Sequence, residues 1–439
     1  MSRETARTSA RATPDRDVLA PSSSKSQMRR REFLWLPLAA SAATAPSGED
    51  WPVWGGKNRD FIVNTSGLAD SWPASGPKRI WARALGDGYS GIACENGVLY
   101  TAYRNPGRET IVALSAATGQ TIWEYSYSTV FTNSFAEKVG PGPYAMPQVM
   151  GDRLLTASSV GVIHSIDKRT GKPVWSHDLY REFHGSHLEF GYACHALPYK
   201  DTLIYMAGGQ GDAALAFRQS DGGLVWKSLQ FTNSYSSPLL IHVDGEEQVA
   251  AVGARTVFGF RPATGELLWS HPHETQYGLA VSTPAWGPGN LLFVASAYGV
   301  GARVIELHQT RGKTTVKELW YDPHLELHIG TVIQRDGWVY ISSGYNGPVL
   351  MSAVEMKTGK IGWRQRGFAK AQLLWADGKL ILADEDGTLA LCRATPEKFE
   401  VVSKFQVLEN IAWTPPTLVG TRLYLRDRKT IVALDLGKG

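Results

Sequence analysis

One short phrase recurs along this sequence and limits what the chain can fold into. It consists of a small residue, an apolar residue, several polar residues and a turn with glycine, and a tryptophan follows four positions after that glycine. Full copies end at Trp123, Trp175, Trp226, Trp269 and Trp363, a longer version ends at Trp320, and a degenerate one ends near Phe399. A unit of this size cannot bury its own apolar face, so the repetition predicts stacked units that pack on their neighbours.

A strand with alternating apolar and polar residues precedes each phrase. We expect these strands at Val98–Tyr103, Arg153–Ser158, Thr202–Ala207, Gln248–Gly253, Leu291–Ser296, Trp338–Ser343, Lys379–Ala383 and Arg422–Leu425. Gly, Asp and Asn bound these runs, which is typical of hairpins in an all-β array. The Thr-Gly pair of the phrase supplies the positive φ that a short hairpin turn needs. The tryptophan offers a flat face that can pack between neighbouring sheets.

The two ends of the chain carry complementary halves of one phrase. Trp81 ends a phrase that has no beginning, and Val432–Asp435 begins a phrase that has no end. Joining the halves closes a ring and protects its sheet edges, as a propeller requires. The sequence therefore predicts an all-β fold, an eight-bladed β-propeller whose last blade is completed by an N-terminal strand. The alternatives are seven blades, if the Phe399 copy is discarded, and a parallel solenoid.

The segment 28–45 resembles an export signal. A basic start that contains Arg30-Arg31 precedes a short apolar run, and small residues follow, with cleavage favoured after Ala42. The apolar run is shorter than the roughly 20 residues that span a bilayer, and the paired arginines match the twin-arginine pattern. We therefore expect a periplasmic or extracellular protein exported by the twin-arginine route. The alternative is a disordered basic tail followed by a first core strand.

These features divide the chain into four parts. Residues 1–27 are expected to be a disordered or non-native lead-in, and 28–45 a twin-arginine-type signal peptide. Residues 46–74 are expected to form an N-terminal extension that packs on the propeller, and 75–439 the propeller itself.

The distribution of charge argues against a nucleic-acid partner. The formal net charge is +4, but eight of the 45 basic and four of the 41 acidic residues fall in residues 1–42, which leaves 37 of each sign in the rest. A protein that binds nucleic acid should carry a basic stripe on its folded part. We therefore expect no nucleic-acid partner, and we also expect no membrane span and a monomer.

The phrases resemble the repeat of the pyrroloquinoline-quinone (PQQ) propellers, the superfamily of quinoprotein alcohol dehydrogenases and BamB outer-membrane assembly lipoproteins. Further similarity to exported, BamB-like PQQ-repeat proteins lies in Asp50–Gly56 with Arg59-Asp60, in Gly86–Ser90 and in Leu423–Asp427. The resemblance covers residues 50–439 and implies the propeller fold. It does not fix the function, because one fold carries many activities.

The sequence also departs from the characterised members of this superfamily. The dehydrogenases carry two adjacent cysteines over the cofactor, whereas Cys94, Cys194 and Cys392 are far apart in this chain. Their calcium-binding set of Glu, Asn and Asp cannot be assigned by position. BamB is anchored to lipid through a cysteine that does not follow the apolar run here.

Loops that lead into the innermost strands of a propeller ring one mouth of its axial channel. Each such loop in this sequence contains an aromatic residue or a histidine, and we expect a ligand or cofactor site formed by Asp87, Tyr89, Tyr144, His195, Tyr235, Tyr277, His328, Lys370 and Trp413. Polar groups that converge on aromatic walls are typical of small-molecule sites. The alternative is that these residues plug the channel by packing on one another. No catalytic residue is assigned, and the histidine spacing matches no metal motif.

Two classes of function remain open. The first is a non-catalytic binding or scaffold protein of the cell envelope that presents its channel mouth or loops to a protein, peptide or envelope polymer. The second is a PQQ-dependent dehydrogenase that holds PQQ, with calcium, in the axial channel. The twin-arginine route favours the second class, because it often carries proteins folded around a cofactor. The departures in cysteine and calcium residues favour the first more strongly.

The leader generates a testable prediction. Replacing both Arg30 and Arg31 with lysine should leave the protein in the cytoplasm, because the twin-arginine route depends on the arginine pair itself. Cell fractionation followed by immunoblotting measures the outcome. Unimpaired secretion of the double variant would contradict the assignment.

Overall fold

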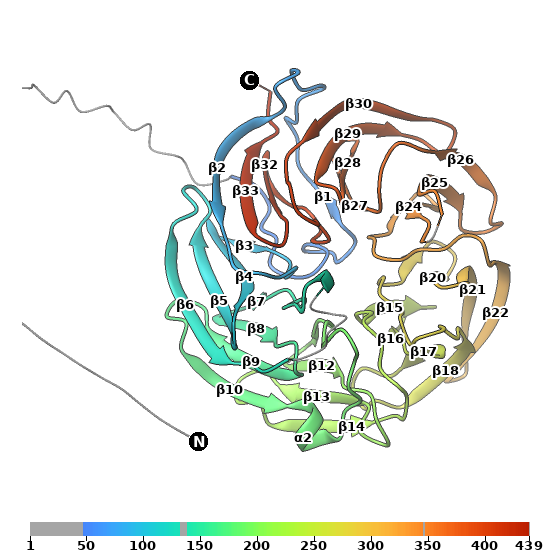
Figure 1. Cartoon of the computed structure of the whole chain (residues 1–439). Coiled ribbons are helices and arrows are strands. Elements are labelled where there is room, and N and C mark those ends of the chain that lie inside the picture. The colour runs from blue at the N-terminus through green and yellow to red at the C-terminus, as the bar shows by residue number, and fades with distance from the viewer. Residues whose placement is uncertain (1–46, 132–137, 346, 439) are drawn as a thin grey trace, which may run out of the picture. The chain divides into compact units, whose positions relative to one another are not determined.

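The computed structural model describes residues 47–131, 138–345 and 347–438. Eight separate sheets surround a common axis in these residues, as Figure 1 shows. The predicted eight-bladed β-propeller is therefore confirmed. The lead-in expected at 1–27 and the signal peptide expected at 28–45 lie outside the described residues.

The first four blades are each built from four consecutive antiparallel strands. Blade 1 contains β3 (Ala93–Glu95), β4 (Val98–Asn105), β5 (Arg108–Ser115) and β6 (Thr121–Ser128). Blade 2 contains β7 (Gln148–Met150), β8 (Arg153–Ala157), β9 (Val162–Asp167) and β10 (Pro173–Asp178). Blade 3 contains β11 (Leu197–Tyr199), β12 (Thr202–Met206), β13 (Ala214–Arg218) and β14 (Leu224–Ser228), and the short helix α2 (Leu179–Phe183) precedes it. Blade 4 contains β15 (Leu239–Val243), β16 (Glu246–Val252), β17 (Thr256–Phe260) and β18 (Leu267–Pro272).

The last four blades include the two strands that come from the N-terminal part of the chain. Blade 5 contains β19 (Ala285–Gly287), β20 (Leu291–Ser296), β21 (Gly301–Thr310) and β22 (Lys313–Asp322). Blade 6 contains β23 (Ile333–Arg335), β24 (Trp338–Ser343), β25 (Leu350–Glu355) and β26 (Ile361–Gln365). Blade 7 contains β1 (Ile62–Val63), β27 (Ala371–Ala376), β28 (Lys379–Asp384), β29 (Thr388–Ala394) and β30 (Phe399–Gln406). Blade 8 contains β31 (Thr417–Val419), β32 (Arg422–Arg426), β33 (Thr430–Asp435) and β2 (Lys78–Ala84).

The tryptophan of the repeated phrase lies on the outermost strand of its blade and packs on a turn of the next blade. The indole Nε1 of Trp123, in blade 1, donates to the carbonyl of Lys168 in blade 2 at 3.0 Å. Gly171, whose φ is 70°, lies so close that any side chain there would come within 2.6 Å of the Trp123 ring. The same packing recurs in the pairs Trp81–Gly119, Trp175–Gly222, Trp226–Gly265 and Trp320–Gly359. The predicted packing of these tryptophans between neighbouring sheets is confirmed.

Trp269 shows what happens when the next blade lacks this turn. Blade 5 has a longer hairpin, in which β21 and β22 have ten residues each. Trp269 Nε1 donates instead to Gln248 Oε1 in its own blade, at 2.8 Å. This difference explains why the phrase that ends at Trp320 is longer than the others.

The N-terminal strand β2 closes the ring. It pairs antiparallel with β33, and Trp81 lies opposite Ala433 in that pairing. The half-phrase at Trp81 and the half-phrase that begins at Val432 therefore form one blade, as the sequence predicts. This closure joins the two ends of the propeller through backbone hydrogen bonds, so β33 is paired on both sides.

A fully buried arginine joins the last blade to the first. The guanidinium of Arg426 donates to the carbonyls of Gly88 (2.9 Å), Ser90 (3.3 Å) and Ala102 (2.7 Å) and to the hydroxyl of Thr101 (2.9 Å). Burial lowers the pKa of Arg426 to about 10, so the group keeps its charge at neutral pH. Four acceptors on blade 1 satisfy this buried cation, which makes it a specific link between β32 and the first blade.

The segment that precedes β2 crosses the propeller before it reaches the outer edge of blade 8. Trp51 exchanges two backbone hydrogen bonds with Cys94 in β3, at 2.8 and 2.9 Å. Further on, β1 pairs in parallel with β27 of blade 7. The amide of Trp72 then donates to the Ser403 hydroxyl on the outermost strand β30, at 2.8 Å. The segment therefore spans the channel from blade 1 to blade 7 and leads the chain outward to β2.

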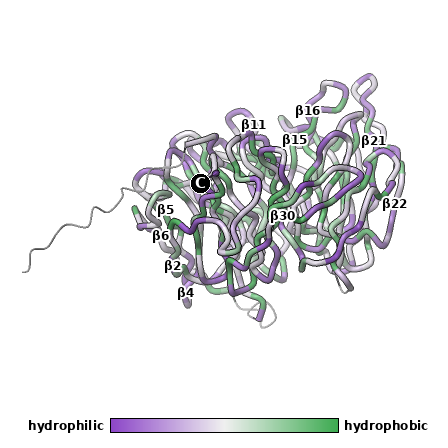
Figure 2. The backbone as a smooth tube through the Cα atoms, turned by 90° about the horizontal axis from the view of Figure 1, so that it is seen from above, coloured by the Kyte–Doolittle hydropathy of each residue, from purple (hydrophilic) through white to green (hydrophobic). Residues whose placement is uncertain are grey.

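The polarity of the chain follows this arrangement. The second strands of the blades are almost entirely buried, as in β12 and β20. Turns at the two edges of the propeller are hydrophilic, including those beside β4 and β16 in the view of Figure 2. Within residues 47–131, 138–345 and 347–438, there is no helix of the length and apolar character needed to cross a membrane.

Ring closure through Trp81 can be tested by stability. Trp81→Ala should lower the free energy of unfolding by about 2–4 kcal/mol, because it removes the ring that packs on Gly119 and the hydrogen bond to the Ala116 carbonyl. Ile122→Ala, at an exposed position of β6, is the matched control and should change it by less than about 0.5 kcal/mol. Urea denaturation measures both, and equal effects of the two substitutions would contradict this account of closure.

Candidate functional site

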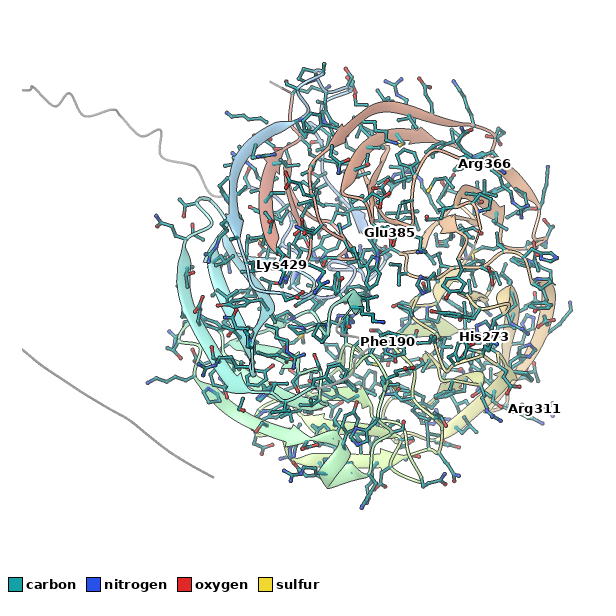
Figure 3. All side chains as sticks on the ribbon, in the orientation of Figure 1. Phe190, His273, Arg311, Arg366, Glu385 and Lys429 are labelled. Carbon is teal, nitrogen blue, oxygen red and sulfur yellow. The ribbon has the colours of Figure 1, made fainter. Side chains whose placement is uncertain are left out.

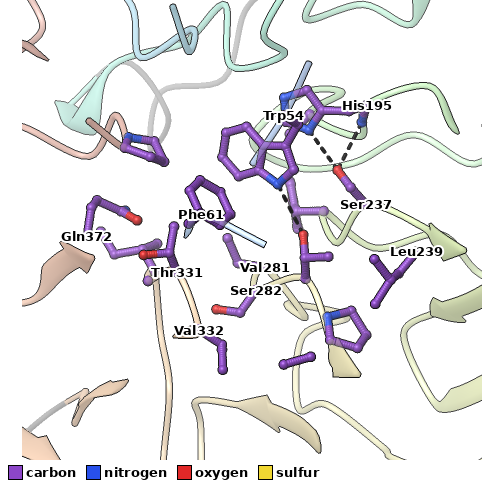
Figure 4. Close-up of a pocket in the computed structure, with 18 of the residues that line it drawn as sticks. Trp54, Phe61, His195, Ser237, Leu239, Val281, Ser282, Thr331, Val332 and Gln372 are labelled. Atoms are coloured by element: carbon purple, nitrogen blue, oxygen red, sulfur yellow. Dashed lines mark hydrogen bonds between the residues drawn. The ribbon is translucent and has the colours of Figure 1, made fainter. Parts of the chain in front are cut away.

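A cavity of about 600 Å³ lies on the propeller axis. Loops that precede the innermost strands form one end of it, and the N-terminal segment Trp54–Ile62 forms the other. This segment pairs with innermost strands near their far ends, since Trp51 contacts Cys94 in β3 and Val63 lies opposite Ala376, the last residue of β27. The cavity is therefore bounded by a rim of loops and by a floor that the chain's own N-terminal part supplies. Figure 4 shows part of its lining.

Three of the predicted residues form an aromatic stack at the rim. Tyr89 stacks on Trp413 with a ring-centroid distance of 4.8 Å and on Tyr144 at 5.9 Å, so the stack joins blades 8, 1 and 2. The hydroxyls of Tyr89 and Tyr144 donate to the carbonyls of Val139 and Gly140. Burial raises the pKa of both tyrosines well above the ordinary value. These hydroxyls are therefore neutral hydrogen-bond donors whose protons are already used within the protein.

A second aromatic group lies on blades 5 and 6. The hydroxyl of Tyr298 lies 2.9 Å from His328 Nε2, and the rings of Tyr298 and Tyr345 are 4.2 Å apart. Burial lowers the pKa of His328 to about 4, with a further contribution from the charge of Lys370. The imidazole is therefore neutral at physiological pH, and its Nε2 shares a hydrogen bond with the Tyr298 hydroxyl.

His195 is held in one orientation and one tautomer on the cavity wall. Its Nε2 accepts the amide proton of Met146 at 2.9 Å, so the ring proton belongs on Nδ1, which donates to Ser237 Oγ at 2.7 Å. The backbone amide of His195 also donates to Ser237 Oγ, at 3.0 Å. Trp54 stacks on the imidazole with a centroid distance of 4.2 Å, and its Nε1 donates to Thr283 Oγ1 at 3.3 Å. Figure 4 shows this platform, in which the Ser237 hydroxyl proton is left to donate elsewhere.

The floor of the cavity carries the charged groups of its lining. Among the described lining residues, Arg59 is the only arginine or lysine and Asp60 the only carboxylate. Arg59 Nη2 donates to Gln148 Oε1 at 3.4 Å, and Asp60 Oδ1 accepts the amide proton of Ile62 at 2.9 Å. Burial lowers the pKa of Arg59 to about 10 and raises that of Asp60.

The structure brings six of the nine predicted site residues together around the cavity and leaves three outside it. The six are Tyr89, Tyr144, His195, Tyr235, His328 and Trp413. Asp87 forms an ion pair with Arg428 at 2.6 Å, and Lys370 forms one with Glu385 at 3.0 Å. Tyr277 is 63% exposed and lines a smaller surface hollow. Lys370 still supports the rim, because Glu385 also accepts the indole proton of Trp413 at 2.9 Å.

Sequence reasoning missed the floor. Trp54, Arg59, Asp60 and Phe61 line the cavity, but they precede the first repeat and belong to none of the rim loops. The sequence signal that could have found them is the segment Asp50–Asp60, which carries two tryptophans, two glycines and a charged pair that the repeats do not explain.

The chemistry of the lining is mainly apolar and aromatic. Leu239, Leu279, Val281 and Trp286 complete the wall between the rim and the floor. The three cysteines are buried and free. In the part of the chain that the structure describes, no group of three or more His, Cys, Asp and Glu residues is placed to hold a metal ion.

The sequence matches a family model described as outer membrane protein assembly factor BamB, over residues 107–351 and again over 197–399. The first match alone covers more than half of the 439 residues. The chain belongs to the BamB family. No curated protein sequence matches it.

Solved structures share the fold of this BamB-family propeller at low sequence identity. BamB from Moraxella catarrhalis is 17% identical with a TM-score of 0.57, and the match covers 82% of this chain and 99% of that one. A europium-containing methanol dehydrogenase is 13% identical with a TM-score of 0.62, over 88% of this chain and 89% of that one. Quinohemoprotein alcohol dehydrogenase from Comamonas testosteroni is 12% identical with a TM-score of 0.59, over 89% and 81%. These similarities establish the PQQ-repeat propeller fold alone.

The buried His195 predicts a specific dependence of stability on pH. Burial and then the charge of Arg59 lower its pKa to about 3, whereas an unfolded histidine titrates near 6.5. Between these values only the unfolded state binds the proton, so stability falls as the pH drops from about 6.5 towards 3. His195→Gln should remove up to about 1.4 kcal/mol per pH unit of this slope.

Urea denaturation of both proteins at pH 7, 6 and 5 measures the slope. His242→Gln, on the exposed side of β15, is the control and should leave it unchanged. Identical slopes in the parent protein and His195→Gln would contradict the assignment of a neutral, buried His195.

Proposed function

We propose that this BamB-family protein is a non-catalytic binding protein of the cell envelope, which holds an apolar or aromatic group of its ligand in the axial cavity. The observation that carries the proposal is the cavity itself. It has an aromatic rim, apolar walls and a floor built from the N-terminal segment. A pocket of this kind, with a few oriented polar groups, suits a ligand that is mainly apolar.

The fixed polar groups support binding rather than chemistry on the ligand. His195 and His328 are neutral; both ring nitrogens of His195 are hydrogen-bonded, and His328 Nε2 is hydrogen-bonded to the Tyr298 hydroxyl. The hydroxyls of Tyr89 and Tyr144 donate to backbone carbonyls. Groups that are held in this way position a ligand by shape and hydrogen bonds. We propose a protein or peptide partner that inserts an apolar side chain at the rim, consistent with the BamB family.

The residues of the cavity do not fit PQQ with calcium. PQQ is a planar quinone that carries several carboxylates, and calcium takes about six to eight oxygen ligands, carboxylates prominent among them. The described lining offers one guanidinium, that of Arg59, and one carboxylate, that of Asp60. The aromatic rim could stack on a flat ring, but the charges of the lining do not match those of this cofactor and its ion. We therefore derive no redox step for this protein.

The proposed location is the periplasm or the outside of the cell, reached by the twin-arginine route. The leader pattern at Arg30-Arg31 supports this part of the proposal. Membership of the BamB family is compatible with an envelope protein. We also propose that the protein is a monomer. One chain supplies both the rim and the floor of the cavity, so a second copy is not needed to form it.

Blocking the cavity tests the proposed function. Ala193 lines it, so Ala193→Phe should fill part of the space and weaken binding of the neutral probe 2-naphthamide at least about tenfold. Ala82→Phe, on the exposed outermost strand β2, is the matched control and should bind like the parent protein. Tryptophan fluorescence titration reports binding, since Trp54, Trp286 and Trp413 line the cavity. Failure of the parent protein to bind the probe would refute the proposal.

A second measurement separates binding from catalysis. The parent protein is incubated with PQQ and calcium, and its absorbance spectrum and dye-linked oxidation of alcohols are recorded. We expect the spectrum of free PQQ and no oxidation. Oxidation that Ala193→Phe abolishes would show that the protein is a dehydrogenase and would overturn the non-catalytic assignment.

A further inference from the structure

We infer that Arg59 is an anion receptor on the cavity floor, and that the natural ligand enters with a carboxylate directed towards Arg59 and its apolar body between the aromatic walls. This inference rests on the proposed function and adds the charge and the orientation of the ligand. The chemistry is that of a carboxylate attached to an aromatic or aliphatic group. Such a group can be a small organic acid or the C-terminal residue of a peptide.

The first observation is that Arg59 has a hydrogen-bond acceptor but no counterion. The single hydrogen bond of its side chain within the described residues, to Gln148 Oε1, is long at 3.4 Å, and no described carboxylate lies within ion-pair distance. Its neighbour Asp60 instead accepts the amide proton of Ile62. A guanidinium has five N–H donors, so most of those on Arg59 are free to bind a ligand.

The second observation is that Arg59 is partly buried and is the only arginine or lysine among the described lining residues. Burial lowers its pKa to about 10, which leaves it charged at neutral pH. His195, which is close enough to feel the charge of Arg59, is neutral. A partly buried charge that has no counterion is costly to a folded protein. An anionic ligand would offset this cost, and a planar carboxylate matches the geometry of the guanidinium.

The third observation is the backbone that carries Arg59. Its φ is 62°, and that of Phe61 is 59°, both in the left-handed region that favours glycine. Gly55 and Gly56 in the same loop also have positive φ, so the loop is tightly folded. A long side chain at such a position costs conformational energy relative to glycine. The tightly folded loop thus fixes the backbone from which the Arg59 side chain extends.

The fourth observation is that the Arg59 side chain is positioned by a rigid partner. Gln148 is fully buried, and its Nε2 donates to the Ala196 carbonyl of the neighbouring blade at 2.9 Å. Its Oε1 also accepts the backbone amide of Trp54, at 3.4 Å. Gln148 thus ties the floor loop to blades 2 and 3 and places the cation beside the Trp54 platform. A flat apolar group above that platform would have its carboxylate within reach of the floor.

The test compares two probes with the same aromatic body and different charge. We expect 2-naphthoate to bind the parent protein about tenfold tighter or more than 2-naphthamide, because a hydrogen bond to a charged group is stronger than a neutral one. Arg59→Gln should abolish this preference while it retains the binding of the amide. Arg366→Gln is the matched control, since Arg366 is exposed at the outer rim of the propeller (Figure 3), and should preserve the preference.

The thermal midpoint of unfolding distinguishes an arginine that is held for a ligand from one that stabilises the fold. Arg59→Gln should leave the thermal midpoint unchanged or raise it, because the substitution removes an uncompensated cation. If Arg59→Gln does not fold, the inference is tested with Arg59→Lys and with the comparison of acid and amide in the parent protein. Arg59→Lys should keep part of the preference for the acid. Acetyl-Ala-Ala-Phe with a free or an amidated C-terminus distinguishes a peptide ligand from a small acid.

Two results would overturn the inference. One is equal affinity of the parent protein for the acid and the amide, and the other is an undiminished preference for the acid in Arg59→Gln. Both leave the proposed function intact as long as the amide binds and Ala193→Phe blocks it. Failure of the amide to bind the parent protein would instead remove the proposed function itself.

Discussion

The packing of an indole on the turn of the next blade is the interaction on which this propeller depends. Each blade is a small sheet with two apolar faces, and it becomes stable only when neighbours cover both. The tryptophan provides apolar area for that contact, and its Nε1 hydrogen bond fixes the angle between blades, as with Trp123 and the Lys168 carbonyl. Gly171 is required there because a side chain would collide with the ring. This contact recurs at five of the junctions between blades, and Trp269 replaces it with a hydrogen bond inside its own blade.

Closure by an N-terminal strand has a consequence for function. β2 is the outermost strand of blade 8, so the chain before it must lead to the outer edge of the propeller. It does so by crossing the axial channel. That crossing places the loop Trp54–Ile62 at the end of the axial cavity. The segment that completes the fold is thus also the segment that supplies the floor. A change that loosened closure would therefore disturb the cavity as well, which links stability and ligand binding in this protein.

The rim and the floor of the cavity differ in chemistry for a physical reason. The rim residues come from the similar loops that precede the innermost strands, and Tyr89 and Tyr144 direct their hydroxyls to backbone carbonyls. The floor loop is not part of the repeat, so its side chains are not constrained by packing between blades. It can carry a cation such as Arg59 that lacks a counterion within the described residues. The apolar character of the site thus comes from the repeat, and its charge comes from the segment outside it.

The sequence by itself determined the number of blades, the strands and the closure, because each depends on residues near one another in the chain or on a periodic pattern. The Thr-Gly turns, the alternating strands and the two half-phrases at Trp81 and Val432 were sufficient for this. Six of the nine predicted rim residues also line the cavity, since a loop before each innermost strand must face the axis. Only the tertiary structure decided that Asp87 and Lys370 are used in ion pairs with Arg428 and Glu385, because those partners lie on other strands or blades. It alone brought Arg59 close enough to His195 to affect its pKa, because two segments more than a hundred residues apart meet only when the ring closes and the N-terminal segment enters the channel.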